Sequence, residues 1–478
     1  MSFYKIVSGI NPQIFRGYDL RGMMGTDLSP DVYYTLGRAY ATFLARRRIQ
    51  SCPVGRDSRK NGAEYQEAFM TGLNDGGVDT IDIGLTLSQI IYFASYHFLS
   101  KGGTIVTASH NPPEYNGLKL GTGYSETMIT PEIQELRMIA ESGKFVEGKG
   151  GRKAEDISKA YREYILSLFS LKKRWKVVVD ACNATAGLFL PQLLREAGCE
   201  VIEQNCDVDE NFPLGSPDPT DVEVLERIAE GVKKSRADIG FGYDADGDRM
   251  AVVDGRGRSI WMDSIVAIFA KDVLSTMPGA PIVFNTFCSR QVKETIEAYG
   301  GKAEMWITGH SFIKAKVKEL RSPFGGELSG HIFFMDNFFG HDDSAYASLR
   351  LLTYLERINK TLAEEMDSLP VYVSSPEIKI KLPDEVKFKV ISGKVTDAFK
   401  KKWPQGEYTQ IDGVRVDLPD RMAIVRASQN GPYAGVKFEG KTREIYEEMR
   451  QTVLEILKEQ PEIVWGDPMN ANEKALTG

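Results

Sequence analysis

Two patterns of apolar and polar positions alternate along the first three quarters of the chain. Short β-branched apolar runs predict buried strands at residues 78–84, 104–107, 175–180, 238–242 and 281–284. Apolar positions at helical spacing predict helices at residues 31–48, 61–76, 188–197, 221–234 and 291–299. Strands and helices that alternate in this way indicate mixed or parallel sheets covered by helices.

The pattern changes near residue 370. Alternating apolar and polar positions predict strands at 376–382, 407–411, 413–417, 421–426 and 434–439, with helices near 388–402 and 442–458. This order is typical of an α+β domain. The predicted fold class is α/β, with three similar mixed-sheet domains in series and a smaller C-terminal α+β domain. The predicted domain bounds are 1–153, 154–256, 257–369 and 370–478, the first of them at the glycine- and charge-rich segment 148–153.

Composition narrows the class of protein. The chain has 478 residues, too many for one core, with 42% hydrophobic and 26% charged residues and a net charge of −7. This balance argues against nucleic acid as the main partner. No apolar run reaches membrane-spanning length and the first residues form no signal peptide. Five scattered cysteines without a CxxC pair indicate a reducing compartment, so we expect a cytoplasmic protein.

The run 104–107 leads into a candidate reactive loop. Ser109 follows the predicted strand, Pro112-Pro113 prevents a helix from starting, and Asn116-Gly117 predicts a tight turn. Because a hydroxyl is a poor nucleophile until a neighbour takes its proton, His110 and Lys119 are the candidate proton acceptors. The alternative is a polar turn with a capping serine.

Three aspartates, Asp244, Asp246 and Asp248, alternate after a predicted strand. Carboxylate oxygens at this density suit a hard cation, and Mg²⁺ would also take an oxygen from a substrate or water. Arg249 suits an anion that the metal shares. An exposed acidic turn and an aspartyl-nucleophile phosphatase motif are alternatives, although Asp248 stands where the latter needs Thr or Val. A helix–loop–helix calcium loop is excluded, because it needs glycine and glutamate where Arg249 and Gly255 stand.

Further polar loops follow other predicted strands. Residues 308–311 carry His310, and residues 325–331 carry donors and acceptors that suit adjacent sugar hydroxyls: Glu327, Ser329 and His331. In the last segment Arg426, Ser428 and Asn430 combine guanidinium, hydroxyl and amide groups in one turn, which suits an oxyanion.

These motifs, in this order, resemble the α-D-phosphohexomutase family. TASHNP (107–112), DADGDR (244–249), GELSGH (326–331) and RASQNGP (426–432) resemble its active-serine, metal, sugar and phosphate loops, and FRGYDLRG (15–22), GRDSR (55–59), FPLGSPDP (212–219) and TGHS (308–311) add to the resemblance. GEL with SGH is most similar to the phosphomannomutase/phosphoglucomutase subgroup. The resemblance implies four domains around one central cleft.

Three departures from the family pattern stand out. Asn430 and Gly431 replace Thr and Glu of the phosphate loop, which usually reads RxSxTEP. Phe287 stands where related enzymes often carry a substrate-contacting lysine, and Leu214-Gly215-Ser216 stands where histidine and asparagine are common. The first two bear on sugar preference and affinity more than on the reaction.

The implied activity is reversible interconversion of hexose 1-phosphate and hexose 6-phosphate, of mannose or glucose, through phosphorylated Ser109 and a hexose 1,6-bisphosphate, which also serves as activator. The resemblance implies one Mg²⁺ per chain on Ser109, Asp244, Asp246 and Asp248, charge neutralisation by Arg249 and Arg21, and proton transfer by His110 and Lys119. It assigns substrate binding to Tyr18, His310, Glu327, Ser329, His331, Arg426, Ser428 and Asn430. The expected protein is a monomer or weak homodimer without nucleic-acid or membrane partners.

Three alternative functions stay open at this point. A phosphoglucosamine mutase would use the same chemistry on another sugar. A metal-dependent sugar phosphatase would pass the phosphate to water. A noncatalytic sugar-phosphate sensor needs no nucleophile, so Ser109, Lys119 and the three aspartates argue against it.

Overall fold

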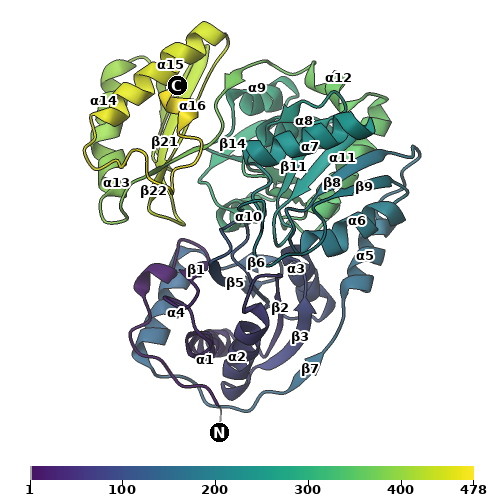
Figure 1. The fold of residues 1–478 in the computed structure, drawn as a ribbon, viewed down its shortest axis with the longest axis vertical. Helices are drawn as coiled ribbons and strands as arrows, with labels where there is room; N and C mark the ends of the chain where they lie inside the picture. The colour runs from purple at the N-terminus through teal and green to yellow at the C-terminus, as the bar shows by residue number, and fades with distance from the viewer. Residues whose placement is uncertain (1–2) are drawn as a thin grey trace. The chain divides into compact units, whose positions relative to one another are not determined.

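The computed structural model describes residues 3–478, which divide into two compact units. The first unit extends to Trp261 and includes the later segment Ser329–Glu365. The second unit consists of Met262–Leu328 and Met366–Gly478. Figure 1 labels the elements of both units.

A seven-stranded mixed sheet organises the start of the first unit. Its order is β1-β5-β4-β2-β3-β7, with β6 paired to β5. The strands are β1 (Leu20–Met23), β2 (Ser51–Arg56), β3 (Asp79–Leu85), β4 (Thr104–Val106), β5 (Tyr115–Gly123), β6 (Glu126–Thr127) and β7 (Arg152–Ala154). The accompanying helices are the short 3₁₀ helix η1 (Pro12–Ile14), α1 (Pro30–Arg46), α2 (Gly62–Asp75), α3 (Ser88–His97) and α4 (Thr130–Ser142).

One detail of this sheet differs from the sequence pattern. Asn116-Gly117 forms no tight turn, because both residues already pair with β1 inside β5. That prediction was wrong, since the reversal is made earlier, at 109–114. The segment 148–153, predicted as a domain boundary, enters β7, which pairs in parallel with β3.

A second sheet in the first unit has the order β12-β11-β10-β8-β9. Its strands are β8 (Lys176–Asp180), β9 (Glu200–Gln204), β10 (Ile239–Tyr243), β11 (Met250–Asp254) and β12 (Ser259–Ile260), accompanied by α5 (Ser158–Ser167), α6 (Ala186–Glu196) and α7 (Val222–Ser235). β10 and β11 are antiparallel neighbours, so residues 244–249 form the turn between them. The later segment adds β16 (Ile332–Phe334), α11 (Ser344–Ile358) and all but the last residue of α12 (Leu362–Met366).

The second unit begins with a parallel arrangement of β14 (Lys302–Trp306), β13 (Pro281–Asn285) and β15 (Phe324–Gly326). Its helices are α8 (Met262–Leu274), α9 (Arg290–Ala298) and α10 (His310–Glu319). Ile282, Val283 and Phe284 of β13 are almost wholly buried. Such a continuous apolar run is expected of a parallel strand covered on both faces.

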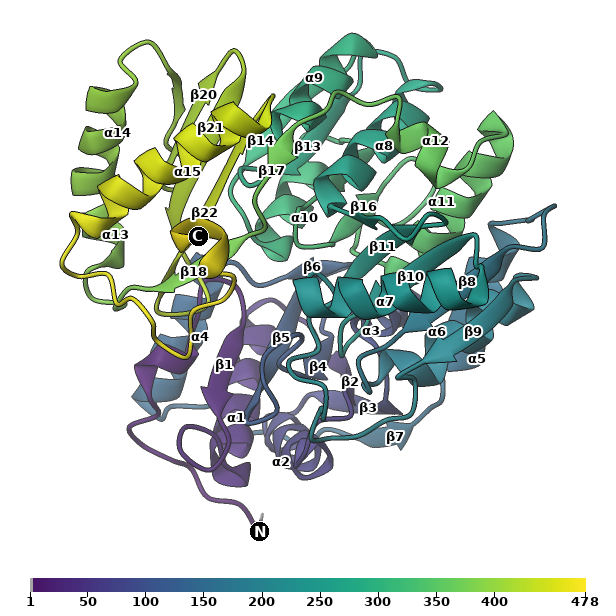
Figure 2. The same cartoon turned by 45° about the horizontal axis from the view of Figure 1, so that its top comes forward.

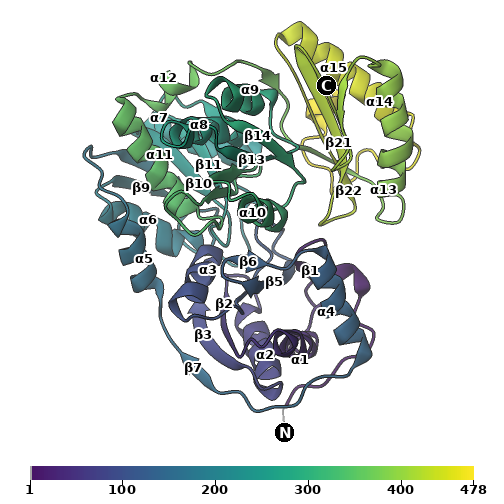
Figure 3. The same cartoon turned by 180° about the vertical axis from the view of Figure 1, so that it is seen from behind.

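The last part of the second unit is an antiparallel sheet in the order β17-β22-β21-β20-β19, with β18 also paired to β22. The strands are β17 (Val373–Ser374), β18 (Ile378–Lys381), β19 (Glu407–Thr409), β20 (Val414–Leu418), β21 (Arg421–Ala427) and β22 (Tyr433–Gly440). The helices are α13 (Lys387–Lys389), a π-helical turn (Val390–Val395), α14 (Thr396–Lys402), α15 (Arg443–Lys458) and α16 (Lys474–Thr477). Figures 2 and 3 show α14 and α15 on the same side of this sheet.

The two faces of the last sheet have opposite chemistry. Val414, Val416, Val436 and Phe438 point into the core with α15, as the period-two pattern predicts. The residues that alternate with these apolar positions are also buried. Among them, Arg415, Lys437 and Glu439 are only 0–1% exposed. This second set forms a charged sheet face (Arg415, Lys437 and Glu439), which binds elements of the same unit.

Four contacts satisfy the charged sheet face. Arg415 donates to the carbonyl oxygens of Thr286 and Cys288 at 2.6 and 2.5 Å. Lys437 Nζ lies 2.5 Å from Asp263 Oδ2, on α8. Glu439 Oε1 accepts a bond from the Arg290 backbone N–H at 2.9 Å. Buried charges are tolerated because each has a partner.

None of the helices described in residues 3–478 is both long and apolar enough to cross a membrane.

Candidate active site

The predicted nucleophile lies in a buried loop after β4. Ser109 has a left-handed backbone conformation, with a φ of 51°, which costs a non-glycine residue about 1–2 kcal/mol. Its Oγ donates a hydrogen bond to Asp244 Oδ2 at 2.7 Å and lies 3.3 Å from His110 Nδ1. The fold therefore brings the serine loop and the aspartate turn together, as a shared ion requires.

The three aspartates occupy the turn between β10 and β11 and are completely buried. One carboxylate oxygen from each aspartate lies within 4.8 Å of the other two. Asp246 Oδ1 and Asp248 Oδ1 accept no hydrogen bond from any described residue. Buried carboxylate oxygens without donors suit a hard cation, so the donor set fits Mg²⁺.

Lys119, on β5, neutralises part of this negative charge. Its Nζ lies 2.6 Å from Asp246 Oδ2 and 2.5 Å from Asp248 Oδ2. Burial disfavours the ammonium, but the two carboxylates outweigh it and raise the pKa of Lys119 well above its ordinary value. Lys119 is therefore a cation in this arrangement.

The carboxylates do not share the charge equally. Burial, with the charges of Asp246 and Asp248, raises the pKa of Asp244 well above its ordinary value. Burial and the Asp246 charge also raise the pKa of Asp248. Burial opposes ionisation of Asp246 too, but the Lys119 ammonium outweighs it and lowers the pKa of Asp246.

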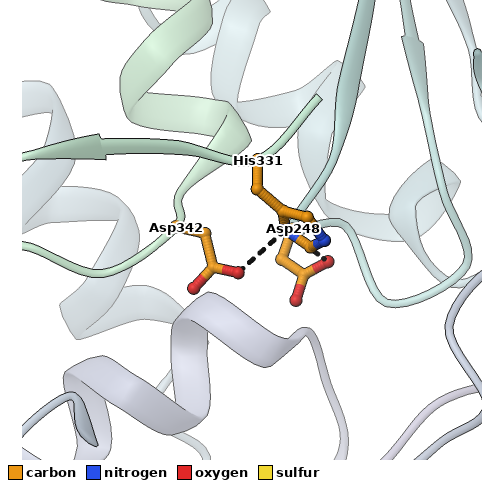
Figure 4. A group of neighbouring side chains, drawn as sticks. All are labelled: Asp248, His331 and Asp342. Atoms are coloured by element: carbon orange, nitrogen blue, oxygen red, sulfur yellow. Dashed lines mark ion pairs between the residues drawn. The ribbon is translucent and has the colours of Figure 1, made fainter. Parts of the chain in front are cut away.

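Arg249 and His331 form a second side of the site. Figure 4 shows His331 beside Asp248 and Asp342. Arg249 Nε donates to His331 Nε2 at 3.1 Å, which leaves the imidazole proton on Nδ1. His331 Nδ1 lies 2.9 Å from Asp342 Oδ2 and 3.6 Å from Asp248 Oδ1. His331 thus connects the arginine after the aspartates with a carboxylate that the sequence did not single out.

A close backbone contact places His331 there. The Met250 N–H donates to the carbonyl of Gly330 at 3.1 Å. A Cβ at Gly330 would lie 2.3 Å from the Met250 oxygen, and its φ is 92°. Only glycine fits both conditions, so the SGH motif brings its histidine to the aspartate turn.

Arg21 and Tyr18 belong to the same unit. Arg21, on β1, pairs with Asp19 at 2.8 Å and donates to the carbonyl of Thr107, at the start of the serine loop. Tyr18 is buried in the segment just before β1. Ser329 lies in the later segment of this unit, two residues before His331.

Sequence reasoning missed several buried residues around the serine and aspartates. Ser88, at the start of α3, donates to Asp246 Oδ2 at 2.6 Å. Asp342 lies against His331, and Arg59 donates to the carbonyl of Ser109 at 2.5 Å. The charged GRDSR motif was the available signal for Arg59; no local pattern distinguishes Ser88 or Asp342.

The other predicted substrate residues lie in the second unit. Glu327, directly after β15, accepts a bond from the Gly309 N–H at 2.7 Å. His310 begins α10 next to that glycine and is 3% exposed. The TGHS and GEL motifs are therefore joined by a hydrogen bond.

Arg426 is the penultimate residue of β21, and its Nε nitrogen anchors it. Its Nε donates to Asp412 Oδ2 at 2.8 Å. The same carboxylate accepts bonds from Thr286 Oγ1 at 3.0 Å and the Thr308 N–H at 2.9 Å. Asp412 thus orients Arg426 and connects it to two loops of the α/β part of the unit.

The loop after Arg426 is held from within. Ser428 Oγ accepts bonds from the backbone N–H groups of Asn430 and Gly431, both at 3.1 Å. Lys387 Nζ, almost fully buried, donates to the carbonyls of Ser428 and Gly431 at 2.5 and 2.9 Å. Ser428 therefore shapes the loop, with Lys387 beneath it.

Phe287, one of the departures from the family pattern, is also buried. Its ring lies 5.7 Å from the Arg426 guanidinium carbon. A Cβ at Gly435 would come within 2.7 Å of it. Phe287 packs against β22 in place of a lysine.

Comparison with protein families settles the class. Three consecutive models match this chain: phosphoglucomutase/phosphomannomutase α/β/α domain I at residues 12–147, domain II at 159–257 and domain III at 261–372. Together they span more than half of the chain. The chain belongs to the phosphoglucomutase/phosphomannomutase family.

Individual relatives agree with the family assignment. A phosphomannomutase/phosphoglucomutase of Pseudomonas aeruginosa is 39% identical over 445 residues, covering 93% of this chain and 95% of that protein. A phosphoglucomutase of Neisseria gonorrhoeae is 36% identical and covers 96% and 100%. The crystal structure of a phosphoglucomutase/phosphomannomutase family protein from Burkholderia thailandensis has a TM-score of 0.86 at 34% identity, covering 94% of this chain and 98% of that one.

These findings confirm the predicted family and the fold class of three α/β domains in series with a further C-terminal domain. They also confirm the prediction of a hexose phosphate mutase, an isomerase.

Proposed function

We propose that this chain reversibly moves a phosphoryl group between O1 and O6 of glucose and mannose monophosphates, with Ser109 as the phosphorylated residue. The observation that carries the proposal is the 2.7 Å hydrogen bond from Ser109 Oγ to Asp244, one of three convergent buried aspartates. Relatives named phosphomannomutase/phosphoglucomutase support both sugars.

Asp244, Asp246 and Asp248 would hold Mg²⁺, with an oxygen at Ser109 as a further ligand. When bound, the ion supplies positive charge to the phosphoryl oxygens during transfer. Arg249 and Arg21 would add guanidinium charge on two further sides, since each lies against one of the two loops.

Proton transfer and charge neutralisation are assigned to different residues. The Oγ–P bond of phosphorylated Ser109 breaks as the substrate hydroxyl oxygen bonds to phosphorus, and the hydroxyl proton needs an acceptor. His110 Nδ1, 3.3 Å from Ser109 Oγ, would accept this proton and return it to the Ser109 Oγ that leaves phosphorus. Lys119, held as an ammonium by two carboxylates, contributes charge.

The product of this first transfer is a hexose 1,6-bisphosphate, which must turn around and return its other phosphate to Ser109. A second anion site is therefore needed, and we assign it to Arg426, Ser428 and Asn430. Glu327, Ser329, His310 and His331, with Tyr18, would bind the sugar, and free hexose 1,6-bisphosphate would act as activator. Five buried cysteines without disulfides are in keeping with a cytoplasmic location. We further propose a monomer or weak homodimer.

A substrate panel tests the proposal. Glucose, mannose and glucosamine 1-phosphates are incubated with Mg²⁺ and a trace of glucose 1,6-bisphosphate, and 6-phosphates and free phosphate are both measured. We expect 6-phosphates of glucose and mannose. Preference for the glucosamine ester would favour a phosphoglucosamine mutase, and mostly free phosphate would favour a phosphatase.

Ser109→Ala should lower kcat by about 1,000-fold or more while substrate still binds, because it removes the group that carries the phosphate. Ser100→Ala is the matched control, since this buried hydroxyl only donates to backbone oxygens. Undiminished turnover in Ser109→Ala would refute the assignment of the nucleophile.

A further inference from the structure

A buried ion pair lies directly beneath the serine loop and takes no part in the chemistry proposed above. Arg59 and Asp57 are 3% and 1% exposed, and Arg59 Nε lies 3.2 Å from Asp57 Oδ2. The terminal nitrogens of Arg59 donate to four backbone oxygens, at 2.5, 2.5, 2.7 and 3.1 Å: those of Ser109, Asn111, Pro112 and Tyr115.

This loop needs an external donor. Pro112 and Pro113 carry no backbone N–H, so the loop has fewer internal donors for its own carbonyl oxygens. Buried carbonyl groups without donors are costly. A guanidinium has five N–H groups in a fixed plane, and can therefore fix several carbonyls at once, which an ammonium cannot do in the same geometry.

The second half of the ion pair acts on the serine itself. Thr107 Oγ1 donates to Asp57 Oδ2 at 2.6 Å and accepts the Ser109 N–H at 2.8 Å. Asp57 is oriented in turn by the Arg59 backbone N–H, at 3.0 Å. The amide and the carbonyl of Ser109 are thus both fixed, and these two groups flank the residue whose φ is positive.

The pair is also anchored on the domain that supplies the aspartates. The Ser58 N–H donates to Thr185 Oγ1 at 2.7 Å, just before α6. The Arg59 guanidinium lies 4.9 Å from the centre of the Phe212 ring. The same short segment, 57–59, therefore contacts the serine loop on one side and the second α/β domain on the other.

From this geometry we infer that Asp57, Arg59 and Thr107 form a positioning network that holds Ser109 in its left-handed conformation and in register with Asp244. The inference rests on the proposed function, because it concerns transfer to and from Ser109. None of the hydrogen bonds of the network involves a residue that we assign to sugar or second-anion binding. We therefore expect it to act on the rate of phosphoryl transfer and to leave the binding of hexose phosphate unchanged.

Thr107→Val tests the network with little change in side-chain volume. It removes both hydrogen bonds of Thr107 Oγ1, and we expect kcat to fall by about 100-fold. KM for glucose 1-phosphate and the affinity for Mg²⁺ should stay within about threefold. Thr107→Ser restores the hydroxyl and should recover most of kcat. Thr80→Val is the control, because Thr80 is an equally buried threonine that bonds to Asn74 at a distance from the loop.

The rate of Ser109 phosphorylation by glucose 1,6-bisphosphate, followed by mass spectrometry and expressed per folded protein, gives a readout that a general loss of stability would not move. We expect it to fall in Thr107→Val and Arg59→Lys and to stay at the wild-type rate in Thr80→Val.

Three results would overturn the inference. The first is wild-type kcat in Thr107→Val, and the second is an equal loss in Thr80→Val. The third is a change in KM alone. An inactive wild-type protein, run alongside, would overturn the proposed function and the inference together, so the two failures are distinguishable.

Discussion

At the scale of single residues, three neighbouring aspartates acquire three different acidities. Asp246 keeps its charge because Lys119 and Ser88 both bind its Oδ2. Asp244 and Asp248 are buried beside that charge and therefore hold protons more readily than aspartates in water. A metal that binds the turn must displace those protons.

This difference predicts the pH dependence of metal binding. Because the pKa values of Asp244 and Asp248 are raised, protons compete with Mg²⁺ at pH values where ordinary aspartates are already ionised. The affinity for Mg²⁺ should therefore rise as pH increases through this raised range, and binding should release protons. Calorimetric titration in buffers of different ionisation enthalpy measures both; an affinity independent of pH from mildly acidic to neutral conditions would contradict the prediction.

The residues predictable from sequence were those whose chemistry is concentrated in a short stretch. Ser109 could be found because a proline pair follows it by three residues, and the aspartate turn because Asp246 and Asp248 flank a glycine. Asp342 and Ser88 could not, since each gains its role only from a contact far along the chain, with His331 and Asp246.

At the scale of elements, the loop after β21 depends on a helix that the sequence pattern only partly described. The predicted helix 388–402 consists of α13, a π-helical turn and α14. Lys387 begins α13, and its ammonium binds the Asp384 carboxylate and two loop carbonyls. Periodicity predicted the bounds of the helix to within one residue. The role of Lys387 could not be predicted, because it depends on contacts with a loop that forms only in the folded protein.

Lys387→Met should weaken substrate binding. Without the ammonium, the carbonyls of Ser428 and Gly431 lose their donor and the loop can rearrange. We expect KM for glucose 1-phosphate to rise about tenfold with kcat changed less, as steady-state kinetics would show. Lys389→Met, an exposed lysine of the same helix, is the control. A lower kcat at constant KM would contradict the assigned role.

At the scale of the whole molecule, the last domain is not attached to its unit by apolar packing alone. The charged sheet face buries an arginine, a lysine and a glutamate against α8 and the loop after β13. The sequence pattern predicted that apolar and polar side chains alternate along β20 and β22. From that pattern alone, the charged side chains would be expected to face solvent. Both faces are buried because α8 and the loop after β13 cover the charged one.

Removing one partner of this layer should be costly. Lys437→Met leaves the buried Asp263 carboxylate without its ammonium, and we expect a loss of about 3–5 kcal/mol in the free energy of unfolding. Lys437→Met with Asp263→Asn removes both charges and should recover much of that loss. Urea denaturation of both variants, with Lys458→Met as an exposed control, measures the difference; equal stability of the single and double variants would contradict the prediction.

The charged sheet face also limits how this domain can be exchanged between relatives. A chimera that imports residues 370–478 alone would bring a foreign set of buried charges to the native α8 and the native loop at 286–290. A chimera should therefore fold when α8 and the loop at 286–290 are imported together with the sheet. The part of the chain that must be exchanged as one piece is larger than the C-terminal domain.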